Sequence, residues 1–295
     1  MKQRLVSSFM HTILLSMAIN LSLTALASCN EKGNNEQITP TGVAGGENIS
    51  SADTGHVDAT TFVVNNVQFK IVAVEGGSFV MGSGANDAKS DQKPAHKVTV
   101  SDFSIGQTEV TQELWQAVMG SNPSEFSGKN LPVDNVTWEE CQVFVARLNK
   151  LLHESGKLAS DKAFHLPTEA QWEYAARGGK KSKGYRYAGS DDINAVAWTR
   201  DNANDMTHPV ASKRPNELGL YDMSGNVWEW VQDYYSPYDG AEQTNPTGPA
   251  SNTGRVVKRG GSWYYAPEYY FRTSFRYGYY TSISDSSIGV RLCLS

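Results

Sequence analysis

Short apolar runs mark the first part of the chain that has a regular pattern. They lie at residues 62–64, 69–74, 78–81 and 96–100, and the last of them alternates between apolar and polar positions. Runs of this length that are rich in Val, Ile and Phe are typical of strands with a buried face. We therefore expect the folded part of the chain to begin near Phe62 with several short strands.

Three segments farther along combine helical spacing with N-cap signals. Thr111 precedes the first segment, residues 112–119, and Thr137 forms a capping box with Glu140 before the second. Another capping box opens at Thr168 before the third segment. The middle segment has apolar residues along one helical face at Cys141, Phe144, Val145, Leu148 and Leu152. These signals predict three helices.

The regular pattern fades after Gly178. The rest of the chain is rich in Gly, Asn, Asp, Pro and aromatic residues and has only a few short apolar runs. Long irregular segments inside a compact domain are commonly functional, and a bound metal ion is one way to keep them ordered. The sequence thus predicts an α+β fold with little regular secondary structure in its second half.

The N-terminal segment, residues 1–28, has the features of an export signal. Lys2 and Arg4 give it a positive start, and the apolar run over 13–27 is too short and interrupted for a membrane span. Residues 26–29 read Leu-Ala-Ser-Cys, which resembles the lipobox of bacterial lipoproteins. That resemblance implies cleavage before Cys29 and lipidation of Cys29. The alternative is an ordinary secretory signal with an incidental cysteine.

Residues 29–61 would then connect the anchor to the folded part. This segment is rich in Asn, Gly, Ser, Thr and Glu and shows no apolar periodicity, a composition typical of flexible linkers. We therefore divide the chain into a lipoprotein signal peptide (1–28), the lipidated cysteine with its tether (29–61) and one domain (62–295). The expected location is the bacterial cell envelope, at the outer membrane or cell surface, with the membrane as a partner through the lipid.

The charge balance narrows the range of other partners. The chain has 26 Lys and Arg against 31 Asp and Glu, a net charge of −5. Residues 1–28 hold two of the basic residues and no acidic ones, so the mature chain keeps 24 against 31, a net charge of −7. This balance argues against nucleic-acid binding, which requires basic patches. Cys141 and Cys293 remain after Cys29, and the sequence leaves open whether they pair.

Four stretches together resemble the formylglycine-generating-enzyme family, also called the sulfatase-modifying-factor domain. They are residues 76–83, 166–179, 216–230 and 259–263, the last reading Arg-Gly-Gly-Ser-Trp, with a terminal Ile-Gly-Val-Arg at 288–291. Their order and spacing match the family from about residue 66 to the end. The resemblance implies a formylglycine-generating-enzyme fold, an α+β domain with a C-type-lectin-like core.

A calcium site is expected in the third stretch. Asp222 and Glu229 place carboxylates on either side of a tight turn, and hard oxygen ligands of this kind suit Ca²⁺. By resemblance, the ligands of a structural calcium are the Asp222 and Glu229 side chains and the Gly225 and Val227 carbonyls. The alternative is an ordinary turn whose acids cap nearby amides.

The catalytic residues of the family are absent from the fourth stretch. Enzymes of this family use two cysteines after the Arg-Gly-Gly-Ser-Trp motif to bind Cu(I), for which soft thiolates are suitable ligands. Tyr265 and Tyr270 occupy these positions here, and a phenol is a poor Cu(I) ligand. The related iron branch needs three histidines, and no two of the six present have helical ligand spacing. We therefore predict no catalytic residues and expect neither copper nor iron.

The segment 263–280 contains ten aromatic residues among its 18. In the family this region lines the substrate cleft, and Tyr and Trp suit the recognition of peptides or sugars. The cleft residues expected here are Trp263, Tyr265, Tyr269, Tyr270 and Arg272. Two functions remain: a non-catalytic binding or structural module that holds a peptide, glycan or envelope protein, which we favour, and a sulfatase-modifying or related metal-dependent oxidoreductase with an altered active site.

Overall fold

The computed structural model describes residues 59–295. The predicted signal peptide (1–28), the lipidation site Cys29 and the tether as far as residue 58 lie outside the described residues. The first described strand begins at Ala59, three residues before the predicted start near Phe62. Residues 59–61 pair with residues 70–72 in an antiparallel hairpin, and this pairing extends the strand beyond its apolar run.

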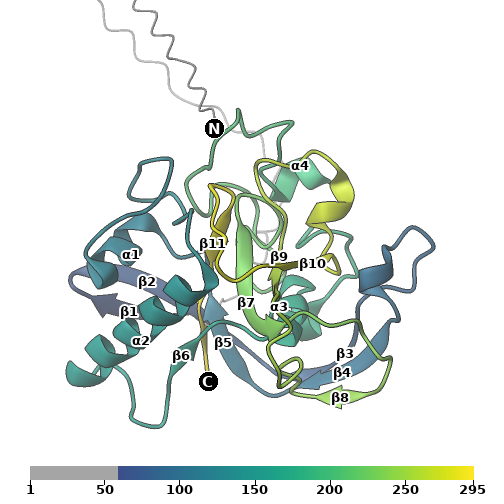
Figure 1. Cartoon of the computed structure of the whole chain (residues 1–295), viewed down its shortest axis with the longest axis horizontal. Helices are drawn as coiled ribbons and strands as arrows, with labels where there is room; N and C mark the ends of the chain where they lie inside the picture. The colour runs from purple at the N-terminus through teal and green to yellow at the C-terminus, as the bar shows by residue number, and fades with distance from the viewer. Residues whose placement is uncertain (1–58) are drawn as a thin grey trace, which may run out of the picture. The chain divides into compact units, whose positions relative to one another are not determined.

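The first sheet joins the two ends of the domain. Its five strands run in the order β1 (Ala59–Val64), β2 (Val67–Val74), β5 (Phe103–Gly106), β12 (Cys293–Leu294) and β6 (Phe164–His165). Helices α1 (Gln112–Met119) and α2 (Trp138–Glu154) lie beside this sheet (Figure 1). Trp115 of α1 stacks on Phe144 of α2 with ring centroids 4.8 Å apart, and both belong to the main apolar core.

The predicted helices are confirmed with their caps. The Thr111 side chain accepts a hydrogen bond from Leu114 N–H, and both capping boxes are formed, at the start of α2 and of α3 (Glu169–Ala176). These caps satisfy amides that the first helical turn leaves without partners. Local sequence signals were sufficient to place all three helices.

Two further sheets organise the rest of the domain. One has the order β10 (Arg276–Tyr279), β9 (Val256–Arg259), β7 (Trp228–Tyr234) and β11 (Ile288–Val290). The other has the order β3 (Gly77–Met81), β4 (His96–Val100) and β8 (Gln243–Thr244). The remaining elements are the short helix α4 (Ile193–Val196) and 3₁₀ turns at Ser90–Gln92, Gly179–Lys181 and Glu268–Phe271. The predicted α+β class is confirmed, and long irregular connections separate these short strands.

Strand β7 is the main element that the pattern did not reveal. Six of its seven residues are buried or nearly so, because it lies between β9 and β11. Glu229 and Asp233 interrupt its apolar run, so neither a continuous nor an alternating apolar pattern appears. Its parallel pairing with β11 joins residues 228–230 to residues 288–290.

Buried ion pairs connect α3 to the β7–β9–β10 sheet. Arg259 is fully buried and bonds to Glu173, while Arg276 bonds to Glu169 at 2.6 Å. A desolvated charge is costly unless it is paired, so these contacts fix α3 against the sheet.

Within residues 59–295 no helix is long and apolar enough to cross a lipid bilayer.

Candidate functional site

Tyr265 and Tyr270, at the positions of the family's cysteines, are brought together by a tight turn after β9. Gly261 adopts a φ of +78°, and a Cβ at this position would lie 2.6 Å from the Phe271 ring. A larger residue therefore could not bring the 3₁₀ turn Glu268–Phe271 this close. The rings of Tyr265 and Tyr270 lie 4.6 Å apart, and both meet Trp228 edge-on.

More tyrosines lie around this pair. Tyr264 contacts Tyr265, and Tyr269 contacts Tyr270, with ring centroids 5.7 and 4.4 Å apart. Seven large apolar side chains are exposed in residues 59–295, and four of these lie between residues 264 and 283: Tyr264, Tyr277, Tyr280 and Ile283. We call the rings of Tyr264, Tyr265, Tyr269, Tyr270, Tyr277 and Tyr279 the tyrosine surface.

Lys258 lies beneath this surface. Only 2% of it is exposed, and its ammonium lies 4.0 Å from the centre of the Tyr279 ring and 5.0 Å from Trp228. Lys258 pairs with no carboxylate in the described part of the chain, and its burial lowers its pKa to about 8. The aromatic faces therefore stabilise this cation, together with the charge of the nearby Asp285.

Three of the five predicted cleft residues lie together in the structure. Tyr265, Tyr269 and Tyr270 are half-buried within the tyrosine surface. Trp263 is buried instead, and its indole N–H donates to the Ser286 carbonyl. Arg272 bonds to Asp87 and lines a separate hollow of about 390 Å³. The exposed rings of Tyr264 and Tyr277 were not in the predicted set.

The tyrosine surface offers phenols rather than ionised nucleophiles. The pKa of Tyr270 is raised, first by its hydrogen bond with Tyr269 and then by burial. Burial also raises the pKa of Tyr265. Both side chains are therefore neutral near pH 7, and they can donate and accept hydrogen bonds. Cys141 and Cys293 are buried on α2 and β12 and do not pair with each other.

The predicted calcium ligands Asp222 and Glu229 both lie near Arg291, which bonds directly to Glu229. Asp222 accepts a hydrogen bond from Ala211 N–H through Oδ2, but its buried Oδ1 has no partner. The Glu229 carboxylate accepts from Arg291 at 2.7 Å and from the Trp172 indole at 2.6 Å. Glu109 is a third buried carboxylate here, and it accepts from Val227 N–H.

The charge balance of this cluster bears on the calcium prediction. Burial is the main cause of the rise in the pKa of Asp222 to about 6. Burial also raises the pKa of Glu109 well above its usual range. The unpartnered Asp222 Oδ1 and the excess of acids over bases fit a cation. Glu229, however, is engaged by Arg291, and within residues 59–295 no three acidic, His or Cys side chains converge as a metal site. The calcium ion stays a prediction.

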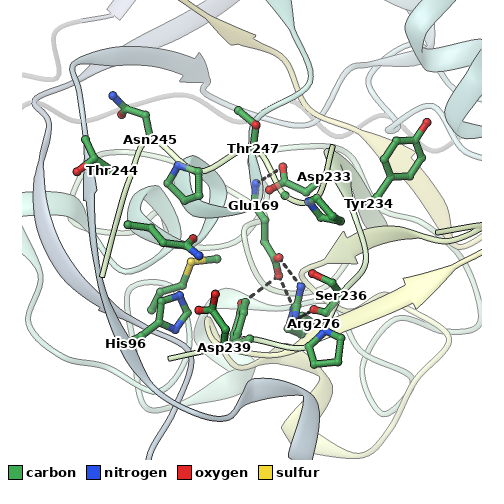
Figure 2. Close-up of a pocket in the computed structure, with 17 residues that line it drawn as sticks. His96, Glu169, Asp233, Tyr234, Ser236, Asp239, Thr244, Asn245, Thr247 and Arg276 are labelled. Atoms are coloured by element: carbon green, nitrogen blue, oxygen red, sulfur yellow. Dashed lines mark hydrogen bonds and ion pairs between the residues drawn. The ribbon is translucent and has the colours of Figure 1, made fainter. Parts of the chain in front are cut away.

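The largest hollow that we describe, of about 570 Å³, lies elsewhere, between β4, the end of β7 and the segment 235–249, which contains β8. Figure 2 shows His96, Glu169, Asp233 and Arg276 among its lining residues. None of the site residues predicted from the sequence lines this hollow. Its walls come from segments far apart in the chain, so no local motif marks it.

Comparisons with known proteins agree with this architecture. The chain is 36% identical over 235 residues to the "Chaperone protein LppX" of Paenibacillus barcinonensis, which covers 65% of this chain and 78% of the relative. It is 35% identical over 166 residues to the "Formylglycine-generating enzyme" of Streptomyces coelicolor, which covers 50% of this chain and 47% of that enzyme.

A solved structure, "Treponema denticola variable protein 1", superimposes with a TM-score of 0.72 at 32% identity, over 80% of this chain and 98% of the other. Residues 60–295 also match the family described as "Sulfatase-modifying factor enzyme 1-like domain", which is nearly the whole described part. The predicted resemblance is therefore confirmed: this chain belongs to the family of sulfatase-modifying factor enzyme 1-like domains.

Proposed function

We propose that this protein is a non-catalytic binding module of the bacterial envelope, anchored by a lipid on Cys29, and that the tyrosine surface contacts its partner. The observation that carries the proposal is the concentration of exposed aromatic rings at the former catalytic position: Tyr264 is 54% exposed and Tyr277 44% exposed. Exposed apolar groups gathered in one place commonly mark interaction sites.

The packing of these rings also favours binding over chemistry. The Tyr265 ring contacts Tyr264 on one side and Tyr270 on the other. Each of these contacts limits the rotation of the rings that make it. Rigid amphipathic rings provide contact area at a low cost in conformational entropy. Their hydroxyl groups suit a peptide, a glycan or another envelope protein as the partner.

The comparisons support a family that extends beyond catalysis. One relative carries the name of a chaperone, and another carries the name of the formylglycine-generating enzyme. The replacement of both cysteines by tyrosine supports a role other than formylglycine formation for this chain. A catalytic function would require metal ligands other than the thiol pair.

The proposal can be tested by partner capture from an envelope extract. The wild-type protein is compared with a Tyr264→Ser/Tyr277→Ser variant and with Val143→Ser, which changes a 44%-exposed apolar side chain on α2. We expect the double tyrosine variant to lose partners that both other proteins retain. Equal capture by all three proteins would exclude the tyrosine surface as the binding site.

A further inference from the structure

The cavity of about 570 Å³ shown in Figure 2 is separate from the tyrosine surface and has the size of a small-ligand site. It is built from β4, α3, the end of β7, the segment 235–249 that contains β8, and β10. Figure 2 shows His96 and Asp239 on one side of Glu169, and Asp233 and Thr247 on the other. Polar groups therefore face the cavity from two walls.

Asp233 presents one unused oxygen to this cavity. The residue is 3% exposed, and its Oδ2 accepts a hydrogen bond from Glu169 N–H at 2.8 Å. Its Oδ1 has no hydrogen-bond partner among the described residues. Burial raises the pKa of Asp233 to about 8, so near neutral pH the carboxyl group is an uncharged O–H donor.

His96 presents the complementary atom. It is 5% exposed, and its ring packs on Tyr238 with centroids 4.6 Å apart. Its Nδ1 lies 3.1 Å from the Pro94 carbonyl, which can only accept, so Nδ1 carries the proton. In the neutral ring, Nε2 is then an acceptor, and it has no partner within residues 59–295.

The charged groups around Asp233 leave little net charge for a ligand. The charged and titratable groups that surround Asp233 or line the cavity come from several elements. They are Glu169 on α3, Arg259 on β9, Arg276 on β10, His96 on β4, and Tyr238 and Asp239 after β7. Both oxygens of Glu169 are already occupied by Arg276, at 2.7 and 2.6 Å. Among these charged groups only Asp239 has no ion pair, and it is exposed to solvent, so a charged ligand would lose its hydration without gaining a buried countercharge.

We infer that this cavity binds an uncharged, hydroxyl-bearing sugar unit, with Asp233 as hydrogen-bond donor and His96 as acceptor. A hydroxyl group donates and accepts at once, so neighbouring hydroxyls on one ring match these two groups. Thr244, Thr247 and Ser236 add hydroxyl partners along the walls. The rings of Pro237, Pro246 and Pro249 offer apolar faces for the C–H face of a sugar.

The test is a titration of the purified protein with glucose and N-acetylglucosamine, monitored by saturation-transfer NMR, with free lysine and glutamate as charged probes. We expect saturation by a sugar and not by either amino acid. A tetramer of N-acetylglucosamine distinguishes the source: tighter binding of the tetramer indicates a glycan chain, and equal binding indicates a free sugar.

Two variants test the assigned roles. His96→Phe keeps a ring against Tyr238 but removes the acceptor, and it should weaken sugar binding at least about tenfold. Asp233→Asn keeps a donor and should retain binding. At a pH above 8, the pKa of Asp233, the wild type should lose affinity while Asp233→Asn keeps it. Thermal unfolding of each variant verifies that it is folded.

Tyr264→Ser serves as the matched control, because it alters the tyrosine surface alone and should bind sugar like the wild type. Because Tyr264 belongs to the tyrosine surface and does not line the cavity, this variant tests the proposed function and the sugar site separately. The inference is overturned if no sugar saturates the wild type at about 100 mM, where even a millimolar site is filled. It is equally overturned if His96→Phe binds sugar as tightly as the wild type, or if the charged probes bind instead.

Discussion

The rings of Tyr265 and Tyr270 lie with their centroids 4.6 Å apart, packed against Trp228, where the family resemblance places two cysteines. The pair keeps the geometry of a close contact but replaces two soft thiolates with two phenols. A phenol neither binds Cu(I) well nor takes part in thiol exchange. The site thus holds two side chains in close contact but has no thiolate pair with which to bind Cu(I).

We therefore expect no formylglycine formation by this protein. The purified protein is incubated with Cu(I), oxygen and a Cys-x-Pro-x-Arg peptide, and the peptide mass is followed. The Streptomyces coelicolor enzyme is the positive control. The peptide should keep its mass with this protein, and a stoichiometric formylglycine product would contradict the non-catalytic assignment.

Calcium is expected to stabilise the domain through the buried oxygen of Asp222 that lacks a partner. Binding to the folded state alone contributes about 2.7 kcal/mol at a ligand concentration 100 times the Kd. For a domain of this size, this raises the unfolding midpoint by several degrees. Differential scanning fluorimetry with calcium and with a chelator measures the shift.

Asp222→Asn is the matched variant for this measurement, since it removes the charge and keeps the size of the side chain. It should reduce or abolish the calcium-dependent shift. A wild-type midpoint that is the same in calcium and in chelator would count against a structural ion.

The ion pair between Arg259 and Glu173 should contribute strongly to folding stability. Both side chains are fully buried, so Arg259→Met leaves the Glu173 charge with Arg177 as its remaining ionic partner. Loss of one partner of a buried pair costs about 3–5 kcal/mol. Urea unfolding should show this loss, whereas Lys97→Met, which breaks an exposed pair with Glu242, should cost under about 1 kcal/mol. Similar effects from both variants would contradict this assignment.

Asp233 should make the stability fall as the pH rises. Its pKa is raised to about 8 in the folded protein from a usual value of 3.8, so between these values the folded state holds a proton that the unfolded state has lost. The stabilisation from this proton is complete below about pH 4 and disappears as the pH rises through about 8. The slope from this one group is at most about 1.4 kcal/mol per pH unit.

Asp233→Asn removes this titration and keeps the acceptor for Glu169 N–H. The variant should gain stability relative to the wild type as the pH increases from 5 to 8, as measured by thermal midpoints of the two proteins in parallel. A difference between the two proteins that does not change with pH would show that Asp233 is already ionised.

The sequence alone predicted the elements that depend on neighbouring residues. Thr111, Thr137 and Thr168 cap their helices through side chains within three positions, so short windows were sufficient. The four family motifs, matched in order, established the fold class and the loss of the cysteine pair. The motifs indicate the fold class because each is a short run of residues with fixed spacing, which can be recognised without knowing the tertiary structure.

Tertiary structure alone decided the orientation of side chains and the position of the cavity. Strand β7 buries Glu229 and Asp233 because a distant arginine bonds to Glu229 and a distant amide to one oxygen of Asp233, which no local pattern shows. Trp263 turned inward while Tyr264 turned outward, although they are adjacent in sequence. His96, Asp233 and Arg276 meet in one cavity because β7 and β10 share a sheet through β9, while β4 of another sheet packs beside them. Such contacts depend on long-range packing, and the linear sequence does not encode them in any single segment.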